Sequence, residues 1–491
     1  MSIKWINDLS GSQNMHSSPM LLGENESELL LNTSQAQDGA LSNRNGTKLF
    51  LNAISASPIK GLHAFEKQDG TQYLHMVNGG NLYTYANTGG VWPAAQVSAI
   101  WNTNSNINMV NYNGKHYFAS DTAGEYLMSG VETGALSIVA GNLDGNLIGV
   151  SGAYMMIGGG FNNPLKIYFS GVATDTFNTN TDYFQTLTPP TAIASFANGR
   201  PFVIFTQNNI LICDPATLYS TQIDGFGCTS QRSVQSLRGN LIWLSKDGFF
   251  ILNNISAYPQ ELSLPIRNDV TGDAVINQIN GTNYKATASG IFNNKYYCAL
   301  QSLVAPVKGQ TITNCIVEYD FAQQTWKTHS YPSNQIASVF ALFIDNTGTR
   351  NLYAGSLAIG AVYKFNIVGV SQDDNSSGVG QSFTSVINSK HYDFNEGAYG
   401  SAGLKKVDYI YFKYYSASPI TVSFSLDGST TYTAFPNPLP IFTANRWTWQ
   451  MIEVGKECKT IGLQFQCAGQ FTIFTFGFEV EDKRDRGLKG I

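Results

Sequence analysis

The chain has 491 residues, more than one hydrophobic core usually supports, so we expect two or three folding units. Hydrophobic residues make up 43% of it and aromatic residues 12%, whereas charged residues make up only 13%, about half the usual share of soluble domains. The net charge of −5 excludes a general attraction to nucleic acids, and no apolar run is long enough to span a membrane, so we expect no membrane insertion.

Residues 1–57 lack the alternation of β-strands and are rich in Gly, Ser and Asn. Their one apolar cluster is Leu29, Leu30 and Leu31. We expect an extended N-terminal docking arm, because an ordered arm must dock either on the domain that follows it or on a neighbouring subunit. The first ten residues lack the apolar segment of a signal peptide, so we expect synthesis in a cytoplasm.

Residues 58–367 repeat one pattern, in which a short apolar strand, a turn containing Gly or Asn and a strand rich in Tyr, Phe and Ile follow one another. The seven units fall at residues 72–85, 115–127, 153–169, 201–213, 241–252, 295–319 and 351–365. A spacing of about 40–50 residues is the period of a four-stranded propeller blade. We therefore predict an all-β fold with a β-propeller of about seven blades.

Aromatic side chains within these units are expected to pack between blades. The four that we assign to blade packing are Tyr83, Trp243, Trp326 and Tyr363. The segment 318–327 resembles the strand, turn and Trp at the end of a kelch blade, where Asp320 would support the turn.

A change in composition marks the end of the propeller. Residues 368–381 are polar and Gly-rich, as in a linker. Residues 382–481 contain longer alternating runs, which predict a C-terminal β-sandwich, and residues 482–491 form a charged tail. Aromatic residues alternate with Lys at 412–415; core packing of the sandwich is favoured over stacking on single-stranded nucleic acid.

The residue types that most often carry chemistry form no catalytic, cofactor-binding or metal-binding pattern. The six histidines are dispersed, and the six cysteines lack paired spacing and are expected to be buried thiols. The segment 425–432 matches a sialidase repeat imperfectly and only once, and we interpret it as a hairpin turn. Glu318 and Asp320 share a strand face, as a glycosidase pair would, but we assign both to blade structure.

The whole pattern resembles the packaged-DNA stabilisation, or tail nozzle, proteins of short-tailed bacteriophages. The segments that carry the resemblance are residues 27–46, 198–213, 316–326, 446–450 and 461–465. In those proteins a polar lead-in ends in a short Arg-X-Gly turn before the first blade, which corresponds here to Arg44, Asn45 and Gly46. The usual members have Arg-Pro-Gly at this turn, so the chain departs from them at Asn45.

The resemblance implies a structural virion protein without enzymatic activity, located in the phage tail. It implies a homohexameric ring below the portal and adaptor, which contacts other tail proteins, closes the DNA channel and later lets double-stranded DNA pass without sequence preference. Subunit docking would then involve the residues of the arm, which are Leu29, Leu30, Leu31, Arg44 and Gly46. A mildly negative protein with few charges suits a conduit, because every phosphate contact would retain the DNA.

Two other functions remain open. A tail propeller that recognises host glycans would stack exposed aromatic residues such as Trp92, Trp101 or Trp447 on sugars. A carbohydrate-active hydrolase would need two carboxylates about 5–10 Å apart in a central pocket.

Overall fold

The computed structural model describes residues 2–51, 53–67, 69–87, 97–131, 135–196, 200–254, 257–394, 404–442 and 447–482. Within these ranges the chain forms forty β-strands and six short 3₁₀-helices. No helix in the described part of the chain has the length and hydropathy needed to cross a membrane. Trp92 and the charged tail beyond residue 482 lie outside the described residues. The 3₁₀-helices are η1 (Gln37–Gly39), η2 (Gln231–Ser233), η3 (Leu264–Ile266), η4 (Ile276–Gln278), η5 (Tyr284–Ala286) and η6 (Ser333–Gln335).

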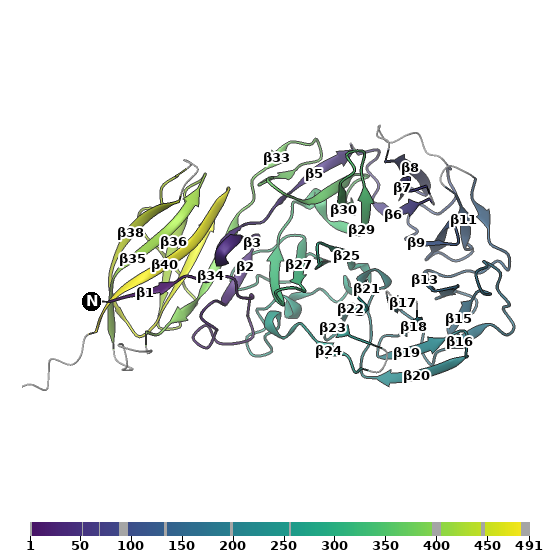
Figure 1. Cartoon of the computed structure of the whole chain (residues 1–491), viewed down its shortest axis with the longest axis horizontal. Helices are drawn as coiled ribbons and strands as arrows, with labels where there is room; N and C mark the ends of the chain where they lie inside the picture. The colour runs from purple at the N-terminus through teal and green to yellow at the C-terminus, as the bar shows by residue number, and fades with distance from the viewer. Residues whose placement is uncertain are drawn as a thin grey trace, which may run out of the picture.

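Seven antiparallel sheets surround one axis and form a β-propeller (Figure 1). Blades 1 to 3 consist of β6 (Ile59–Glu66), β7 (Gln72–Asn78) and β8 (Asn81–Ala86); β9 (Ile107–Tyr112), β10 (Lys115–Ser120), β11 (Met128–Gly130) and β12 (Ser137–Ile138); and β13 (Leu147–Ser151), β14 (Tyr154–Gly158), β15 (Lys166–Phe169) and β16 (Tyr183–Gln185). Blades 4 and 5 consist of β17 (Ala192–Phe196), β18 (Arg200–Phe205), β19 (Asn209–Asp214) and β20 (Tyr219–Asp224); and β21 (Gln235–Leu237), β22 (Asn240–Ser245), β23 (Gly248–Leu252) and β24 (Gln260–Glu261). Blades 6 and 7 contain β25 (Ala288–Phe292), β26 (Lys295–Gln301), β27 (Cys315–Asp320) and β28 (Thr325–His329); and β29 (Ala337–Ile344), β30 (Arg350–Ser356) and β31 (Val362–Ile367).

Each blade packs on the next through a buried apolar cluster, because alternate side chains of every strand point to opposite faces of the sheet. Trp243 lies between blades 4 and 5, with its ring 5.1 Å from that of Phe205. Trp326 lies between blades 5 and 6, and its indole N–H donates to the Leu262 carbonyl at 2.7 Å. Tyr363 is buried between blades 6 and 7, and Tyr83 is half-buried between blades 7 and 1.

The ring closes through a strand from the arm. Strand β5 (Gly46–Leu51) precedes blade 1 in the sequence, but it is the fourth strand of blade 7. It pairs antiparallel with β31, with Lys48 opposite Lys364. Backbone hydrogen bonds between β5 and β31 therefore join the N-terminal and C-terminal ends of the propeller within blade 7. The inner strands β29 of blade 7 and β6 of blade 1 pack against each other.

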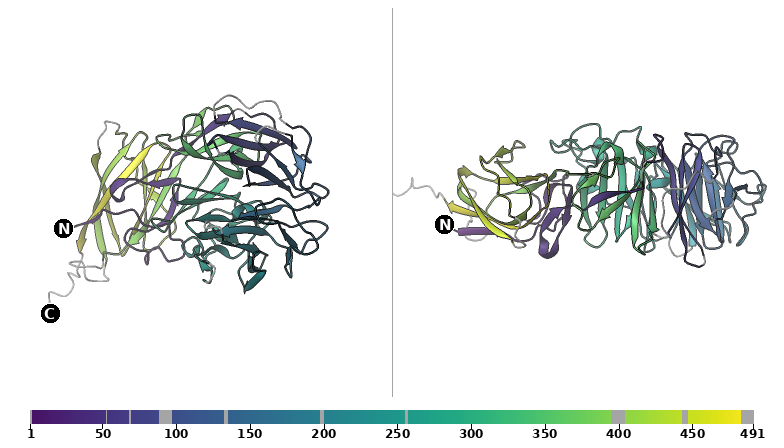
Figure 2. Two further views of the ribbon diagram at one scale, coloured as in Figure 1. Left: turned by 45° about the vertical axis from the view of Figure 1, so that its right-hand side comes forward. Right: turned by 90° about the horizontal axis from the view of Figure 1, so that it is seen from above.

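The rest of the arm belongs to the C-terminal β-sandwich. One sheet contains β1 (Ser2–Ile6), β3 (Thr33–Gln35), β4 (Leu41–Asn43), β40 (Phe471–Asp482), β35 (Lys405–Ser416) and β38 (Thr448–Cys458). The other contains β2 (Ser27–Leu31), β34 (Ser385–Tyr392), β39 (Ile461–Cys467), β36 (Thr421–Leu426) and β37 (Thr433–Ala434). Their inner faces share one apolar core, while the sandwich and the propeller lie side by side in an elongated molecule (Figure 2).

The two domains share a continuous sheet. Strand β2 pairs antiparallel with β34 of the sandwich and parallel with β28 of blade 6, where Leu31 lies opposite Thr328. Residues 1–57 are therefore a structural part of both domains rather than a separate arm, because their described strands pair within three sheets, two of the sandwich and one of blade 7.

The segment 368–381 is not a solvated linker. It contains β32 (Asp373–Asp374) and β33 (Gly380–Gln381), and β32 pairs parallel with β5. Both aspartates are buried, with exposed fractions of 0% and 3%. Their charges are balanced by partners on the N-terminal arm, which sequence composition does not reveal.

Candidate functional site

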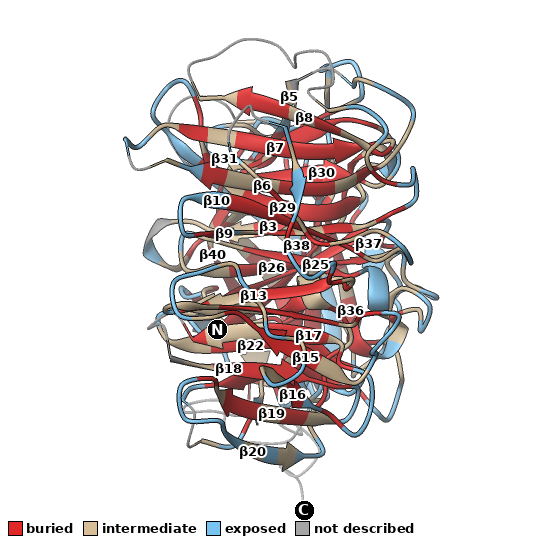
Figure 3. Ribbon diagram, turned by 90° about the vertical axis from the view of Figure 1, so that its right-hand side faces the viewer, coloured by how far each residue is buried: buried red, intermediate tan, exposed pale blue. Residues whose placement is uncertain are grey.

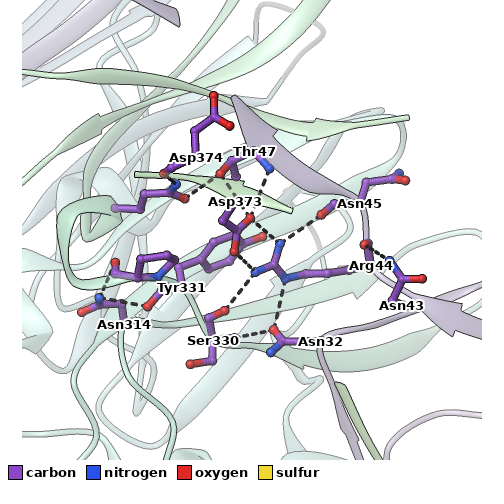
Figure 4. Close-up of polar contacts among 12 residues, drawn as sticks. Asn32, Asn43, Arg44, Asn45, Thr47, Asn314, Ser330, Tyr331, Asp373 and Asp374 are labelled. Atoms are coloured by element: carbon purple, nitrogen blue, oxygen red, sulfur yellow. Dashed lines mark hydrogen bonds and ion pairs between the residues drawn. The ribbon is translucent and has the colours of Figure 1, made fainter. Parts of the chain in front are cut away.

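The junction of arm, propeller and sandwich is built around the side chain of Arg44, which lies between β4 and β5 and is only 3% exposed (Figure 4). Its guanidinium binds the Asp373 carboxylate through two hydrogen bonds, of 2.9 Å from Nη1 and 2.5 Å from Nη2. It also donates to the carbonyls of Asn45 and Ser330, each at 3.0 Å, and to Asn32 Oδ1 at 3.1 Å. Each nitrogen of this buried cation therefore has an acceptor.

Two aromatic rings cover the same guanidinium. Its Cζ lies 3.9 Å from the ring centre of Tyr331 and 3.8 Å from that of Phe383. Burial alone would lower the pKa of Arg44, but interactions with Tyr331 and Asp373 raise it above its ordinary value. The arginine thus remains charged at the centre of the junction.

The two aspartates of β32 hold the start of β5. Asp373 Oδ1 accepts hydrogen bonds from the backbone N–H of Thr47 at 3.1 Å and from its hydroxyl at 3.2 Å. Asp374 accepts from the Leu49 N–H at 2.9 Å and forms an ion pair with Lys48 at 3.4 Å. The strand that closes the propeller is therefore fixed by carboxylates from the segment that leads into the sandwich.

Gly46 and Asn32 complete the junction. A Cβ atom at Gly46 would lie 1.8 Å from the carbonyl oxygen of Gln372, so no side chain fits where β5 meets the segment before β32. Asn32 has a positive φ of 55° and donates from Nδ2 to the Thr384 carbonyl at 2.7 Å. Its Oδ1 accepts from the Ser330 N–H at 2.8 Å, so one side chain contacts both domains.

The three leucines of β2 divide between two cores. Leu29 and Leu31 lie in the apolar cluster between blades 5 and 6, whereas Leu30 lies in the core of the sandwich. These leucines, Arg44 and Gly46 were assigned to subunit docking from the sequence. The structure places all five inside one chain, where they are buried and join its own two domains.

The axis of the propeller is blocked by a second arginine, whose side chain is half-buried. Arg232, in η2 before blade 5, donates to backbone carbonyls of three other blades, at Lys60 (2.6 Å), Ile107 (3.0 Å) and Ser338 (3.0 Å). Its Nε donates to Asn108 Oδ1 at 3.0 Å. Its hydrogen-bond partners are neutral, so burial lowers the pKa of Arg232 to about 10 and the charge of Asp121 offsets only part of this effect.

A cavity opens at each end of this axis. The larger, of about 890 Å³, is lined by the ends of inner strands and includes His63, Glu66, Asn111 and Arg350. The smaller, of about 380 Å³, lies at the other ends of these strands and includes Asp121 and Arg232 itself. Among the described lining residues, each cavity contains a single carboxylate.

The carboxylates considered as a hydrolase pair lie away from these cavities. Glu318 is buried in blade 6, 2.6 Å from Lys295 Nζ and 3.1 Å from His329 Nε2. Burial would raise the pKa of Glu318, but the hydrogen bond with His329 and the charge of Lys295 hold it well below its usual range. Asp320 accepts from the N–H groups of Ala322 and Gln323, as predicted for a blade turn.

Three histidines that are dispersed in the sequence form one cluster, in which His75 and His116 are buried and His63 is half-buried beside the large cavity. Hairpin β6–β7 places His63 opposite His75, and His116 of blade 2 lies 2.6 Å from His75 (Nδ1 to Nδ1) and 3.1 Å from His63 (Nε2 to Nδ1). Burial lowers the pKa of His63 to about 4 and that of His116 well below its ordinary value, with His75 adding to the effect at His116. Within the described residues no group of three or more candidate ligands is arranged to hold a metal ion. The sequence did not indicate this cluster, because the first predicted unit begins at residue 72 and leaves out His63.

The remaining sequence predictions have the following positions. Residues 425–432 contain the end of β36 and the turn that connects it to β37, as predicted for a hairpin. All six cysteines are buried and unpaired. Phe412 and Tyr414 lie in the sandwich core, whereas Lys413 points outward. Trp101 is buried against Phe118, and Trp447 is 48% exposed on the sandwich.

No known protein family matches the chain, and no curated protein is detectably similar to it in sequence. Several hundred solved chains are similar to parts of it in fold, and three of them illustrate the similarity. The WD40 domain of Neurospora crassa Pan2 has 9% identity and a TM-score of 0.42, over 63% of this chain and 89% of that one. The extracellular domain of BT4673, a putative hybrid two-component system from B. thetaiotaomicron, has 12% identity and a TM-score of 0.45, over 70% and 44% of the two chains. The GH74 enzyme of Niastella koreensis has 13% identity and a TM-score of 0.42, over 65% and 44%. With TM-scores below 0.5, these matches add nothing on function, and the assignment as a seven-bladed propeller rests on the sheets of this chain.

Proposed function

We propose that this chain is a structural subunit of a bacteriophage tail, in which six copies form a nozzle ring below the portal and adaptor. The ring closes the DNA exit channel, retains the packaged genome and lets it pass during ejection. The resemblance of residues 27–46 and of the later segments to tail nozzle proteins is the origin of this proposal.

The blocked axis of the propeller is the observation that carries the proposal furthest. Arg232 joins blades 1, 2 and 7 to blade 5 across the axis, so a double helix has no path through a single propeller. A DNA channel must then lie between subunits, as it does in a ring. The junction at Arg44 supports this role, because a propeller and sandwich joined by a buried ion pair and a shared sheet form one stiff building unit.

The low charge of the chain is also consistent with a conduit. Only 13% of residues are charged, and the net charge is −5. Contacts from Lys and Arg to phosphates would retain DNA with a strong salt dependence, whereas a weakly negative lining lets it slide.

The decisive experiment measures copy number in virions of the source phage. Quantitative mass spectrometry should give about six copies for every twelve portal chains, as expected of a closed ring. A copy number far from any ring multiple, or complete absence from the virion, would contradict the proposal.

A second candidate is recognition of host glycans by the propeller, favoured by the polar 890 Å³ cavity on its axis. The cavity is lined by His63, Asn111 and Arg350, and the buried hydroxyl of Ser236 beside it has no hydrogen-bond partner. Its single carboxylate, Glu66, supports binding rather than hydrolysis, which needs two. Glycan-array binding that Arg350→Ala abolishes would favour this candidate over the nozzle.

A further inference from the structure

The outer face of the first sandwich sheet exposes a cluster of large apolar side chains. This aromatic face consists of Trp5, Tyr411, Trp447, Trp449 and Met451, which come from β1, β35 and β38 and the residue before β38. The three tryptophans and Met451 are 39–48% exposed. Exposed apolar groups gathered in this way mark an interaction surface more often than isolated ones do.

The aromatic face is held in place by contacts beneath it. Trp5 lies over Gly477 of β40, where an added Cβ would come within 2.5 Å of the indole, so the absence of a side chain there makes room for the ring. From this position its ring centre is 6.0 Å from that of Tyr411 and 5.3 Å from that of Trp449. Such preorganised rings lose little conformational entropy when a partner binds.

The angles between the rings favour a protein as the partner. Trp5 and Trp449 meet at 70°, and Trp447 and Trp449 at 83°, so neighbouring rings form ridges and hollows instead of a flat platform for a sugar. The hydroxyl of Tyr411 donates to the Glu479 carboxylate, and Lys413 Nζ lies 4.1 Å from the ring centre of Trp447, so the face carries charges of both signs beside its rings. Ridges and hollows rich in Trp and Tyr are typical of the central contacts of protein interfaces.

The strand beside the aromatic face has an open edge. In the described part of the chain, β38 pairs only with β35 along its eleven residues. A cavity of about 470 Å³ separates residues 450–454 of β38 from residues 435–439, at the open side of the sandwich. Half of the backbone N–H and C=O groups of such an edge strand point outward and are available to another strand.

A second open edge lies on blade 4. All six residues of β20 are exposed or half-exposed, and Leu218 and Tyr219 at its start are 64% and 61% exposed (Figure 3). The outer strands β12, β16 and β24 of other blades have only two or three residues. In blades 6 and 7, β2 and β32 cover the outer strands, and half of the residues of β8 in blade 1 are buried.

These two edges lie far apart on the molecule, β38 on the outer side of the sandwich and β20 at the lower margin of the propeller (Figure 1). A contact between them joins two copies head to tail and leaves one free edge of each kind, so copies add in one direction until a ring closes. We propose that the β38 edge and aromatic face of one copy bind the β20 edge of the next copy. This contact deepens the proposed function, because it supplies the heterologous interface that a nozzle ring requires.

Cysteine pairing in the purified full-length chain tests the contact. The six native cysteines are buried, so introduced thiols at exposed positions should react with little background. A mixture of Gln450→Cys (β38) and Gln222→Cys (β20) chains should form a disulfide-linked dimer at least about tenfold faster than a mixture of Gln450→Cys with Ser137→Cys. Ser137 is an exposed residue of β12 and serves as the matched control on another blade edge. Equal yields from the two mixtures, or efficient pairing of Gln450→Cys with itself, would overturn the proposal.

Sedimentation provides a second readout. The wild-type chain should form species that are multiples of 53.5 kDa, and Trp449→Ser should weaken self-association at least about tenfold, as loss of a central aromatic contact does. Leu187→Ser, which replaces an 81% exposed apolar residue elsewhere, should leave it unchanged. Thermal unfolding by circular dichroism checks that both variants fold. A wild-type chain that stays monomeric at its highest soluble concentration, or that binds a polysaccharide through Trp449 without self-association, would overturn the contact.

The outcomes separate this contact from the proposed function. A ring multiple in virions together with crosslinks from Gln450→Cys to a different tail protein would overturn the contact and leave the nozzle in place. Absence from virions would overturn the nozzle, while the crosslinks between purified chains would still decide whether β38 binds β20.

Discussion

Two arginines, the buried Arg44 and the half-buried Arg232, each bind oxygen atoms from separate parts of the chain, but with different kinds of acceptor. Arg44 at the domain junction is paired with the carboxylate of Asp373 and covered by two rings, and its pKa is raised. Arg232 on the propeller axis is bound by carbonyl and amide oxygens, and burial lowers its pKa to about 10. An ion pair suits a junction between two domains, whereas carbonyl dipoles suit an axis where the ends of several inner strands meet.

Breaking the ion pair should have the largest effect. Asp373→Ala leaves the charge of Arg44 buried without a counterion, and we expect the free energy of unfolding to fall by about 3–5 kcal/mol. Urea denaturation followed by tryptophan fluorescence measures this free energy of unfolding. Replacing both partners, as in Arg44→Met with Asp373→Leu, should restore much of the loss, and a double variant as unstable as Asp373→Ala would contradict this account.

Removing the axial arginine should cost less. Arg232→Met leaves carbonyls of blades 1, 2 and 7 without a donor, and we expect a loss of about 1–3 kcal/mol, since Arg232 has no hydrogen-bonded carboxylate partner. The same denaturation experiment measures it, with Arg350→Met as a control at an exposed arginine of the large cavity. A loss larger than that of Asp373→Ala would reverse the comparison.

Acid should weaken the interface between blades 1 and 2. His63 has a folded-state pKa of about 4, below the ordinary 6.5, so between these values the unfolded chain binds a proton that the folded chain excludes. Stability is therefore highest above pH 6.5 and falls as the pH drops toward 4, by about 2 kcal/mol from His63 at pH 5. Unfolding curves at pH 7.5 and 5 test this. His63→Gln with His116→Gln should flatten the difference, and an unchanged slope would rule out the cluster as its source.

The smallest effect is expected at the exposed edge of the junction. Lys48 is 48% exposed and pairs with Asp374 at 3.4 Å, so Lys48→Ala should lower stability by less than about 1 kcal/mol. Added salt should remove the difference from wild type. A loss comparable to that of Asp373→Ala would mean that burial is not what distinguishes the two ion pairs.

Much of the fold could be predicted because strands and turns depend on residues that are close in the sequence. Hairpins such as β7–β8 and β22–β23 combine apolar strands with turn residues, and their repetition indicated seven blades. The pairings β5–β31 and β2–β28 join residues about 300 positions apart, and no periodicity reports them. The role of residues 1–57 was therefore predicted only as docking.

The junction could be predicted in part. Arg44 and Gly46 were singled out by a short turn motif, but Asp373 lies in a polar, Gly-rich stretch whose composition suggests a solvated linker. Its burial depends on a partner from the other end of the chain. Arg232 and the histidine cluster were missed for the same reason, because their partners come from several blades.

The position of β5 in blade 7 has a consequence for synthesis. Residues 46–51 leave the ribosome before any blade exists, yet their partner β31 ends at residue 367 and the carboxylates that hold them follow at 373 and 374. Strand β2 pairs with β34, at residues 385–392, which is made later still. Strands β2 and β5 are thus made before the blades but can pair only after β31 and β34 have been made. Long-range pairing of this kind folds slowly and leaves strand edges open to aggregation in the meantime.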